Sequence, residues 1–156
     1  RLVKLYDAQD IVLYDDFAHH PTAITETLRG VRAAHPGSRV WAIFEPRSNT
    51  TVRRFFQTEL ADALACGDVV RLGAVHRNDR IPESERLDIA RLVSDLRERG
   101  ADAESLPDVS RLCEEITSTA RAGDVIVVMS NGGFGGLTGL LRDALEKRFG
   151  ASESAT

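Results

Sequence analysis

The sequence of 156 residues has little of several features that would assign it to a special class of protein. It contains two cysteines and 6% aromatic residues, and no apolar run approaches the roughly 18 residues that a membrane span requires. Its first residues show neither a secretory leader nor a lipidation signal. Twenty basic and 24 acidic side chains give a net charge of −4 without long blocks of one sign. We therefore expect a soluble protein with no membrane partner and no general affinity for nucleic acid.

The two cysteines also match no known functional spacing. Cys66 and Cys113 lie in separate segments that are predicted to be helical, and they fit neither a metal motif nor a redox motif. This favours buried thiols in a reducing compartment over a disulfide. The expected location is the cytoplasm.

What is present is an alternation of strand-like and helix-like segments. Two short β-rich runs at 2–6 and 11–14, separated by the polar stretch 7–10, predict an antiparallel hairpin. Apolar runs of strand length follow at 39–44, 69–75, 103–106 and 124–129. Helical spacing of apolar residues is found from Pro21 to just before Pro36, over 51–65, 87–99, from the cap Asp108 through Ile116, and over 137–149.

These elements predict an α/β fold. Strands that are apolar throughout need both faces covered, so the pattern indicates a doubly wound, mostly parallel sheet with helices on both faces and an antiparallel hairpin at its N-terminal edge. One domain is expected over 1–150 and a flexible tail over 151–156. Ligands of such folds bind beyond the carboxyl ends of the strands.

Polar residues gather in the four loops that follow strands at this edge. The loops read DDFAHHP after the first parallel strand, EPRSNT after the second, HRNDR after the third and SNGGFGG after the last. A purely structural domain would have little reason to concentrate acids, imidazoles, guanidinium groups and glycines there. We therefore place the candidate site in these loops.

The first loop allows several kinds of chemistry. Asp15, Asp16, His19 and His20 could bind a metal, hydrogen-bond a ribose or lie beside a phosphate, and the histidines could instead cap the helix that starts at Pro21. On the ligand edge of this fold we favour a binding role. A two-metal site would be short of ligands, because the chain has only two further histidines.

The other loops are less specific. SNGGFGG opens a helix, so its backbone N–H groups could hold a carboxylate or phosphate, or it could be a tight turn. It is neither a dinucleotide fingerprint nor a phosphate loop, because the required glycine and the GK[ST] ending are missing. In EPRSNT, Arg47 offers a planar fork for carboxylate or phosphate, whereas Asn49 or Thr50 could cap the next helix.

Together, DDFAHHPTAI, FEPRSNT and MSNGGFGG resemble the C-terminal domain of the Mur ligase family, in its murein peptide ligase branch. The resemblance covers almost the whole chain. It implies the third domain of a three-domain, ATP-dependent amide ligase that joins UDP-N-acetylmuramate to the recycled tripeptide L-Ala-γ-D-Glu-meso-diaminopimelate through an acyl phosphate. ATP and Mg²⁺ would be bound mainly by the central domain, so the chain alone is expected to be inactive.

The resemblance also implies roles for individual residues. Contacts to ATP are expected from Arg1, Asp16, Phe17 and His19. Contacts to the peptide substrate are expected from His20, Arg47, Ser48, Asn49, Asn131, Gly132 and Gly133. No metal ligand is assigned to this chain, and its partners would be the two substrates and the other domains of the same enzyme.

Two alternatives stay open at this point. One is a metal-dependent phosphoesterase built on the acids and histidines of DDFAHHP. The other is a non-catalytic α/β binding module that resembles a phospho-receiver, although it lacks the lysine that such a module uses near its last strand.

Overall fold

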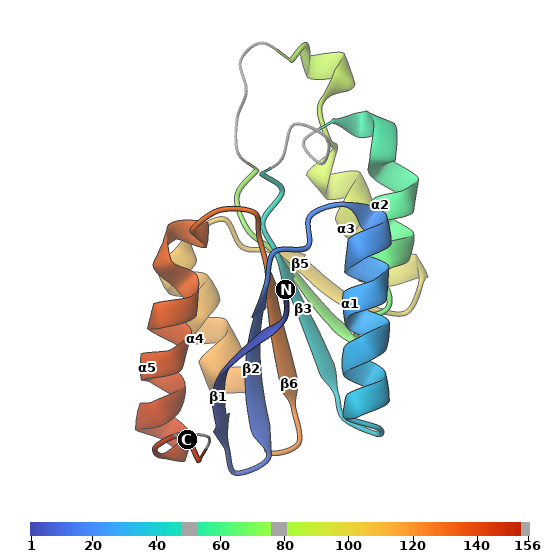
Figure 1. Ribbon diagram of the computed structural model, residues 1–156. Helices are drawn as coiled ribbons and strands as arrows, with labels where there is room; N and C mark the ends of the chain where they lie inside the picture. Colours follow the sequence, from blue (N-terminus) through green and yellow to red (C-terminus); the bar gives the residue numbers. More distant parts are fainter. Residues whose placement is uncertain (48–52, 76–80, 154–156) are drawn as a thin grey trace.

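A computed structural model of the chain describes residues 1–47, 53–75 and 81–153. These residues form a six-stranded sheet with helices on both faces (Figure 1). In order across the sheet, the strands are β1 (Val3–Ala8), β2 (Ile11–Asp16), β6 (Val125–Met129), β3 (Val40–Phe44), β4 (Val69–Leu72) and β5 (Asp102–Ser105). Only the β1–β2 pair is antiparallel. The predicted fold class is therefore confirmed.

The hairpin of β1 and β2 is tighter than the sequence suggested. Ala8 pairs with Ile11, so the connection is the two residues Gln9 and Asp10, both with positive φ (49° and 62°). Such left-handed two-residue turns match the twist of paired strands. The pairing register shifts between Lys4 and Tyr6, which marks a bulge in β1.

The helices divide into two groups. The helices α1 (Pro21–Ala34), α2 (Gln57–Leu64) and α3 (Ile89–Glu98) cover one face, and α4 (Val109–Thr119) and α5 (Leu137–Phe149) cover the other (Figure 1). The strands between them are buried on both sides: Phe44 packs toward the first group, whereas its neighbour Ile43 packs toward the second. This double burial explains the apolar strands. No helix of the described residues is long and apolar enough to span a bilayer.

Local signals set several helix ends. Pro21 occupies the first position of α1, as expected, and the predicted inward residues Ile24, Leu28 and Val31 are buried. Asp108 caps α4 by accepting a hydrogen bond from the N–H of Arg111 at 3.0 Å. Such caps satisfy backbone donors that the first helical turn leaves free.

The continuous helix predicted over 51–65 is wrong in its first part. Residues 48–52 lie outside the described residues, Arg53 forms a single antiparallel bridge with Arg86, and the 3₁₀ turn η1 (Arg54–Phe56) precedes α2. Phe55, expected on the inner helical face, is 81% exposed. The bridge explains the difference, because it ties this segment to the one around the second 3₁₀ turn, η2 (Glu83–Glu85), instead of letting it wind into α2.

Gln57 fixes where α2 begins. Its buried amide donates from Nε2 to the carbonyl of Asp88 at 2.7 Å and accepts from the N–H of Asp88 at 3.0 Å. Asp88 is in turn the N-cap of α3, where its carboxylate accepts from the N–H of Arg91. One side chain thus joins the starts of α2 and α3.

The cysteines differ from each other. Cys113 is buried in α4, where burial raises the pKa of its thiol. Cys66 is only half-buried and lies beyond α2, so the expectation that it is helical and buried is wrong: α2 ends at Leu64. Both thiols are free, as predicted.

The last described residues lie against β1. The Tyr6 hydroxyl donates to the carbonyl of Gly150 at 2.6 Å, and the N–H of Glu153 donates to the carbonyl of Asp7 at 2.6 Å. Part of the segment expected to be a flexible tail is thereby bonded to the sheet edge. Residues 154–156 lie outside the described residues.

A buried ionic network closes the amino ends of the parallel strands. Asp124, 1% exposed, accepts hydrogen bonds from the guanidinium of Arg39 (2.6 and 3.0 Å), from Nε1 of Trp41 (3.0 Å) and from the N–H of Arg121 (3.0 Å). These donors outweigh the cost of burial and hold the pKa of Asp124 below its ordinary value.

We predict that Asp124→Asn lowers the free energy of unfolding by about 3 kcal/mol, because an amide replaces the buried carboxylate opposite Arg39. Urea denaturation measures this. Because the pKa of Asp124 is lower in the folded state, its ionised carboxylate stabilises the fold fully at pH values above the ordinary carboxyl pKa. This contribution is lost as the pH falls through the pKa that Asp124 has in the folded state. The wild-type chain should therefore lose more stability than Asp124→Asn on acidification below about pH 4; parallel pH profiles would contradict this account.

For the junction of α2 and α3, we predict that Gln57→Met costs about 2 kcal/mol. Methionine has a similar volume but leaves the N–H of Asp88 without its acceptor and removes one of the two donors to its C=O, the other being the N–H of Leu92. Glu98→Met, at an exposed position of α3 whose side chain makes no hydrogen bond or ion pair within the described residues, serves as the control for introducing a methionine. Equal unfolding midpoints for the two variants would show that the amide of Gln57 adds nothing.

Candidate functional site

The carboxyl ends of four neighbouring strands lie side by side at one edge of the sheet, here called the rim. The N–H of Ser130 donates to the carbonyl of Asp16, the N–H of Glu45 to Met129, and the N–H of Gly73 to Phe44, at 3.2, 3.1 and 2.9 Å. The loops after β2, β6, β3 and β4 therefore start next to one another, at the upper end of the sheet in Figure 1. The structure places the described starts of these loops together, as the parallel topology predicts, whereas HRNDR at 76–80 lies outside the described residues.

Asp16 is the buried acid of this rim. It is 6% exposed, its Oδ2 accepts from the Thr27 hydroxyl at 2.5 Å, and its Oδ1 lies 3.0 Å from the main-chain nitrogen of Arg1. The side chain of Arg1 is 96% exposed, so its guanidinium makes no contact with Asp16. Both carboxylate oxygens are thus oriented by donors, and each has a second lone pair available.

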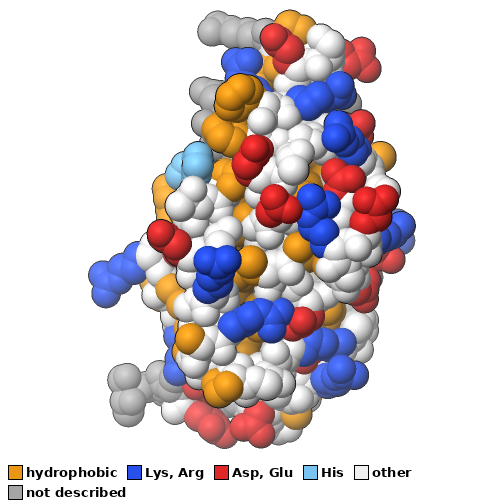
Figure 2. Space-filling view, turned by 90° about the vertical axis from the view of Figure 1, so that its right-hand side faces the viewer, with side chains coloured by type: hydrophobic (Ala, Val, Ile, Leu, Met, Phe, Trp, Pro, Cys, Tyr) orange, Lys and Arg blue, Asp and Glu red, His pale blue; other side chains and the backbone are white. Residues whose placement is uncertain are grey.

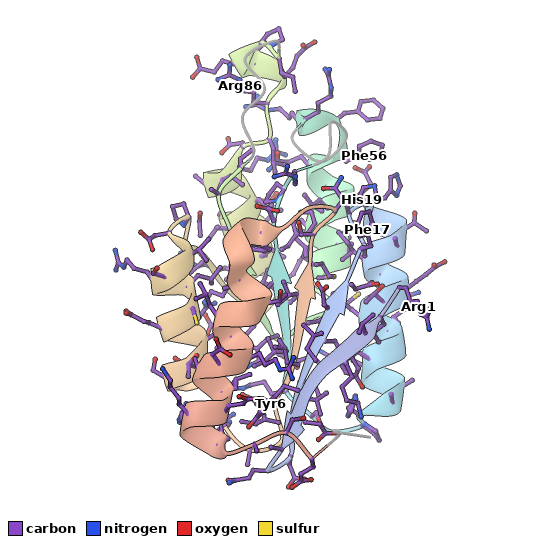
Figure 3. All side chains as sticks on the ribbon, turned by 60° about the vertical axis from the view of Figure 1, so that its left-hand side comes forward. Arg1, Tyr6, Phe17, His19, Phe56 and Arg86 are labelled. Carbon is purple, nitrogen blue, oxygen red and sulfur yellow. The ribbon has the colours of Figure 1, made fainter. Side chains whose placement is uncertain are left out.

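Beside Asp16 is a surface hollow of about 500 Å³. Its wall includes Asp16, Phe17 and His19 from the β2–α1 connection, together with Arg1 and residues of α1 such as Thr27. The Phe17 ring is 61% exposed and lies edge-on to His19 (Figure 3). All four residues expected to contact ATP therefore line a single hollow.

The two adjacent histidines have separate environments. His19 lines the hollow, with its Nδ1 3.0 Å from the carbonyl oxygen of Phe17. His20 is the N-cap of α1: its Nδ1 accepts from the N–H of Thr22 at 3.3 Å, and its ring packs edge-on against Phe56. The capping alternative from the sequence thus holds for His20, and His19 is the one that faces the hollow.

Asp15 differs from its neighbour Asp16. It is half-buried, and burial together with the nearby charge of Asp16 raises the pKa of its carboxyl. No hydrogen bond or ion pair of the described residues joins it to the histidines of this loop. Within the described ranges, no group of three or more His, Cys, Asp or Glu residues is arranged to hold a metal ion. The phosphoesterase alternative therefore has no support from the geometry.

The loops after β3 and β6 form the second half of the rim. The Ser130 hydroxyl donates to Oε1 of Glu45 at 2.6 Å and accepts from the N–H of Gly132 at 3.0 Å. The Arg47 side chain packs on Gly132 so closely that a β-carbon there would overlap it. Arg47, Asn131 and Gly132 are therefore brought together, whereas Ser48 and Asn49 lie outside the described residues.

Asn131 carries a buried acceptor without a protein partner. Its Oδ1 is shielded from solvent and accepts no hydrogen bond in the part of the chain that the structure describes. A buried carbonyl oxygen that is left unpaired is costly unless a ligand or water supplies a donor. The neighbouring Gly133 has open space where a side chain would be.

The glycine-rich loop is a tight strand-to-helix turn. Phe134, Gly135 and Gly136 all have positive φ (47°, 58° and 78°), and Leu137 then begins α5. Phe134 is held in this strained conformation by burial, because its ring fills the space beside Gly73 at the end of β4. The turn alternative is confirmed; anion binding here stays a prediction.

Sequence reasoning missed several residues of the rim. Thr27 lies 11 positions after Asp16 on α1, and nothing in its spacing singles it out. Glu45 and Ser130 lay within the loops of interest, but their mutual hydrogen bond depends on the strand order β6–β3. That order is not visible in one sequence.

Comparisons with known proteins decide the family. The sequence profile described as "Mur ligase, glutamate ligase domain" matches residues 1–132. The chain belongs to this Mur ligase family. Its resemblance to that family is thereby confirmed.

Three relatives illustrate the similarity. An Escherichia coli K12 protein named UDP-N-acetylmuramate–L-alanyl-γ-D-glutamyl-meso-2,6-diaminoheptandioate ligase is 38% identical over 98% of this chain and 32% of its own length. A murein peptide ligase structure from Psychrobacter arcticus has a TM-score of 0.74 at 35% identity, over 91% of this chain and 29% of that one. A single-domain structure from a Haemophilus ducreyi ligase, matched over 92% of this chain and 99% of its own, has a TM-score of 0.67 at 34% identity. This Mur ligase domain thus spans about a third of the curated relative in length.

We predict that Gly73→Ala destabilises this Mur ligase domain by about 2 kcal/mol, because the new β-carbon would lie 2.6 Å from the ring of Phe134. Trimming that ring should relieve the overlap. The double variant Gly73→Ala/Phe134→Leu should then lose at least 1 kcal/mol less than the sum of the two single losses, as measured by denaturant unfolding. Strict additivity would mean that the two sites do not touch.

Proposed function

We propose that this domain closes an ATP-dependent ligase over its substrates. The ligase joins UDP-N-acetylmuramate to L-alanyl-γ-D-glutamyl-meso-2,6-diaminoheptandioate, the substrates that the name of the Escherichia coli relative contains. The observation that carries the proposal is the hollow at Asp16, where a buried, oriented carboxylate lies beside an exposed aromatic ring and an imidazole. Such a set suits a nucleotide, with its hydroxyls, its flat base and its phosphates.

In this proposal Asp16 and its neighbours form one half of the nucleotide site. The free lone pairs of Asp16 accept from ribose hydroxyls, Phe17 offers a face for stacking and His19 provides a polar edge. ATP supplies the activation of the muramate carboxylate. The described residues present no metal-binding group, so we assign the binding of Mg²⁺ and of most of the triphosphate to the other domains of the enzyme.

The second half of the rim then receives the peptide. The guanidinium fork of Arg47 suits a carboxylate, and the unpaired Oδ1 of Asn131 suits an N–H donor of the peptide backbone. The predicted set is completed by the N–H of Gly133, by Gly132, whose own N–H donates to Ser130, and by Ser48, Asn49 and the ring of His20.

A separate closing domain makes physical sense for this chemistry. An activated carboxylate is lost to water unless the site excludes solvent, and an amine attacks efficiently only when it is held in line. A domain whose rim contacts both the nucleotide and the peptide excludes solvent and holds the amine in line when it closes. Because the reaction consumes ATP, we place the enzyme in the cytoplasm.

We predict that Asp16→Asn in the full-length ligase lowers kcat/KM for ATP at least tenfold. The amide keeps the volume of Asp16 but loses the charge and one of the acceptors that Thr27 and the nucleotide use. Asp143→Asn, an exposed acid on α5, is the matched control and should leave the kinetics unchanged.

The present chain by itself should form no product from the two substrates and ATP. Coupled detection of ADP and mass spectrometry of the ligated product measure both predictions. The proposal fails if the isolated domain turns over at the rate of the complete enzyme, or if Asp16→Asn behaves like the control while both proteins melt at the same temperature.

A further inference from the structure

The hydroxyl of Thr27 bonds to Asp16 rather than to its own helix. A threonine within an α-helix commonly donates to the carbonyl of the residue four positions earlier. Thr117 in α4 does so, because its Oγ1 donates to the carbonyl of Cys113 at 2.8 Å. Thr27 in α1 is half-buried like Thr117, but its Oγ1 donates to Oδ2 of Asp16 at 2.5 Å. Since a hydroxyl has a single proton, this bond replaces the ordinary one.

The stability of α1 does not account for a threonine at this position. Threonine is a weak helix former, because its branched side chain is restricted at χ1. Thr27 is also absent from the set of α1 residues that are buried in the core, which are Pro21, Ile24, Leu28 and Val31. It lines the hollow instead, together with Asp16. The feature of Thr27 that the structure uses is therefore its bond to the carboxylate of Asp16.

This bond fixes the plane of the Asp16 carboxylate. The terminal torsion of an aspartate is broad, so a carboxylate without partners turns easily. Here Oδ2 accepts from Thr27, and Oδ1 lies 3.0 Å from the main-chain nitrogen of Arg1. Each oxygen keeps one further lone pair, and Asp16 lines the hollow. Two acceptors side by side on one fixed group match two neighbouring hydroxyls of a ligand.

Asp16 differs in burial from the exposed charges on this side of the molecule. Figure 2 views the side that carries α1 and α2, and it shows Asp or Glu side chains intermixed with Lys or Arg side chains. Such exposed charges attract a ligand weakly, because water and salt screen them. Asp16 is 6% exposed, so a hydrogen bond to its carboxylate is screened much less. The orientation of this one group therefore has a large effect on binding.

We propose that Thr27 is a positioning residue that enables Asp16 to recognise both hydroxyls of a ribose. This inference rests on the proposed function, in which Asp16 contacts the ribose of ATP. Thr27 acts through Asp16: it holds Oδ2 so that one carboxylate oxygen accepts from the 2′-hydroxyl while the other accepts from the 3′-hydroxyl. A deoxynucleotide leaves one of these buried lone pairs without a donor, which is costly. Thr27 thereby contributes to the selection of ribonucleotides.

The first test replaces Thr27 in the full-length ligase. Valine has the shape of threonine without the hydroxyl, so Thr27→Val should raise KM for ATP about tenfold, while kcat and the KM for the peptide stay nearly unchanged. It should also lower the preference for ATP over 2′-deoxy-ATP and 3′-deoxy-ATP by about threefold. Thr27→Ser keeps the hydroxyl and should retain both wild-type values. Thr117→Val, which loses a hydroxyl bond on the other face of the sheet, is the matched control and should change neither.

A double-variant cycle separates positioning from general support of the helix. If Thr27 acts through Asp16, its loss matters little once the carboxylate is gone. The variant Asp16→Asn/Thr27→Val should therefore have a kcat/KM for ATP within about twofold of that of Asp16→Asn alone. A disturbance of α1 that is independent of Asp16 would instead multiply the two losses, and this result would overturn the inference.

The outcomes distinguish this inference from the function on which it rests. If the wild-type enzyme forms no product from ATP, UDP-N-acetylmuramate and the tripeptide, the proposed function itself fails. If it forms product but uses the deoxynucleotides as well as ATP, or if Thr27→Val keeps the full preference for ATP, the inference alone is wrong. Equal losses in Thr27→Val and Thr27→Ser would also overturn it, because the hydroxyl would then be irrelevant. Assays run well below the melting temperature of the least stable variant, so each value reports folded enzyme.

Discussion

The parallel pairing of β6 between β2 and β3 is the constraint on which the rest of the molecule depends. It brings the carboxyl ends of three strands into register, so that the carbonyls of Asp16 and Met129 accept from the first residues of the neighbouring loops. Without this alignment Glu45 and Ser130 could not bond to each other, and Arg47 could not pack on Gly132. The rim is thus a product of backbone pairing before any side chain contributes to it.

The opposite end of the sheet and the junction of α2 with α3 keep this alignment stable. Both use a buried polar side chain with several partners: the carboxylate of Asp124 with Arg39 and Trp41, and the amide of Gln57 with Asp88. Apolar packing alone does not specify where strands and helices end, because the hydrophobic effect is non-directional. A polar group with fixed partners is satisfied in one arrangement only, and this fixes the ends of strands and helices.

Much of this structure could be predicted from sequence patterns. The strands and the helices α1, α3, α4 and α5 follow from apolar periodicity and caps, and their alternation implies the rim. The segment before α2 differs from the predicted helix, because the spacing of Phe55 and Phe56 fits a helical face and only the long-range bridge of Arg53 with Arg86 shows otherwise. Asp16 was found through its motif, whereas Thr27 was not, because their hydrogen bond joins a strand end to a helix surface.

The two outer strands of the sheet limit its association with other molecules. The outer strand β1 carries a bulge and a Lys4–Asp7 ion pair, and the outer strand β5 carries Asp102 and Glu104. Charged or irregular borders disfavour the addition of a strand from another molecule. The domain is accordingly protected against pairing with its own copies through open strands.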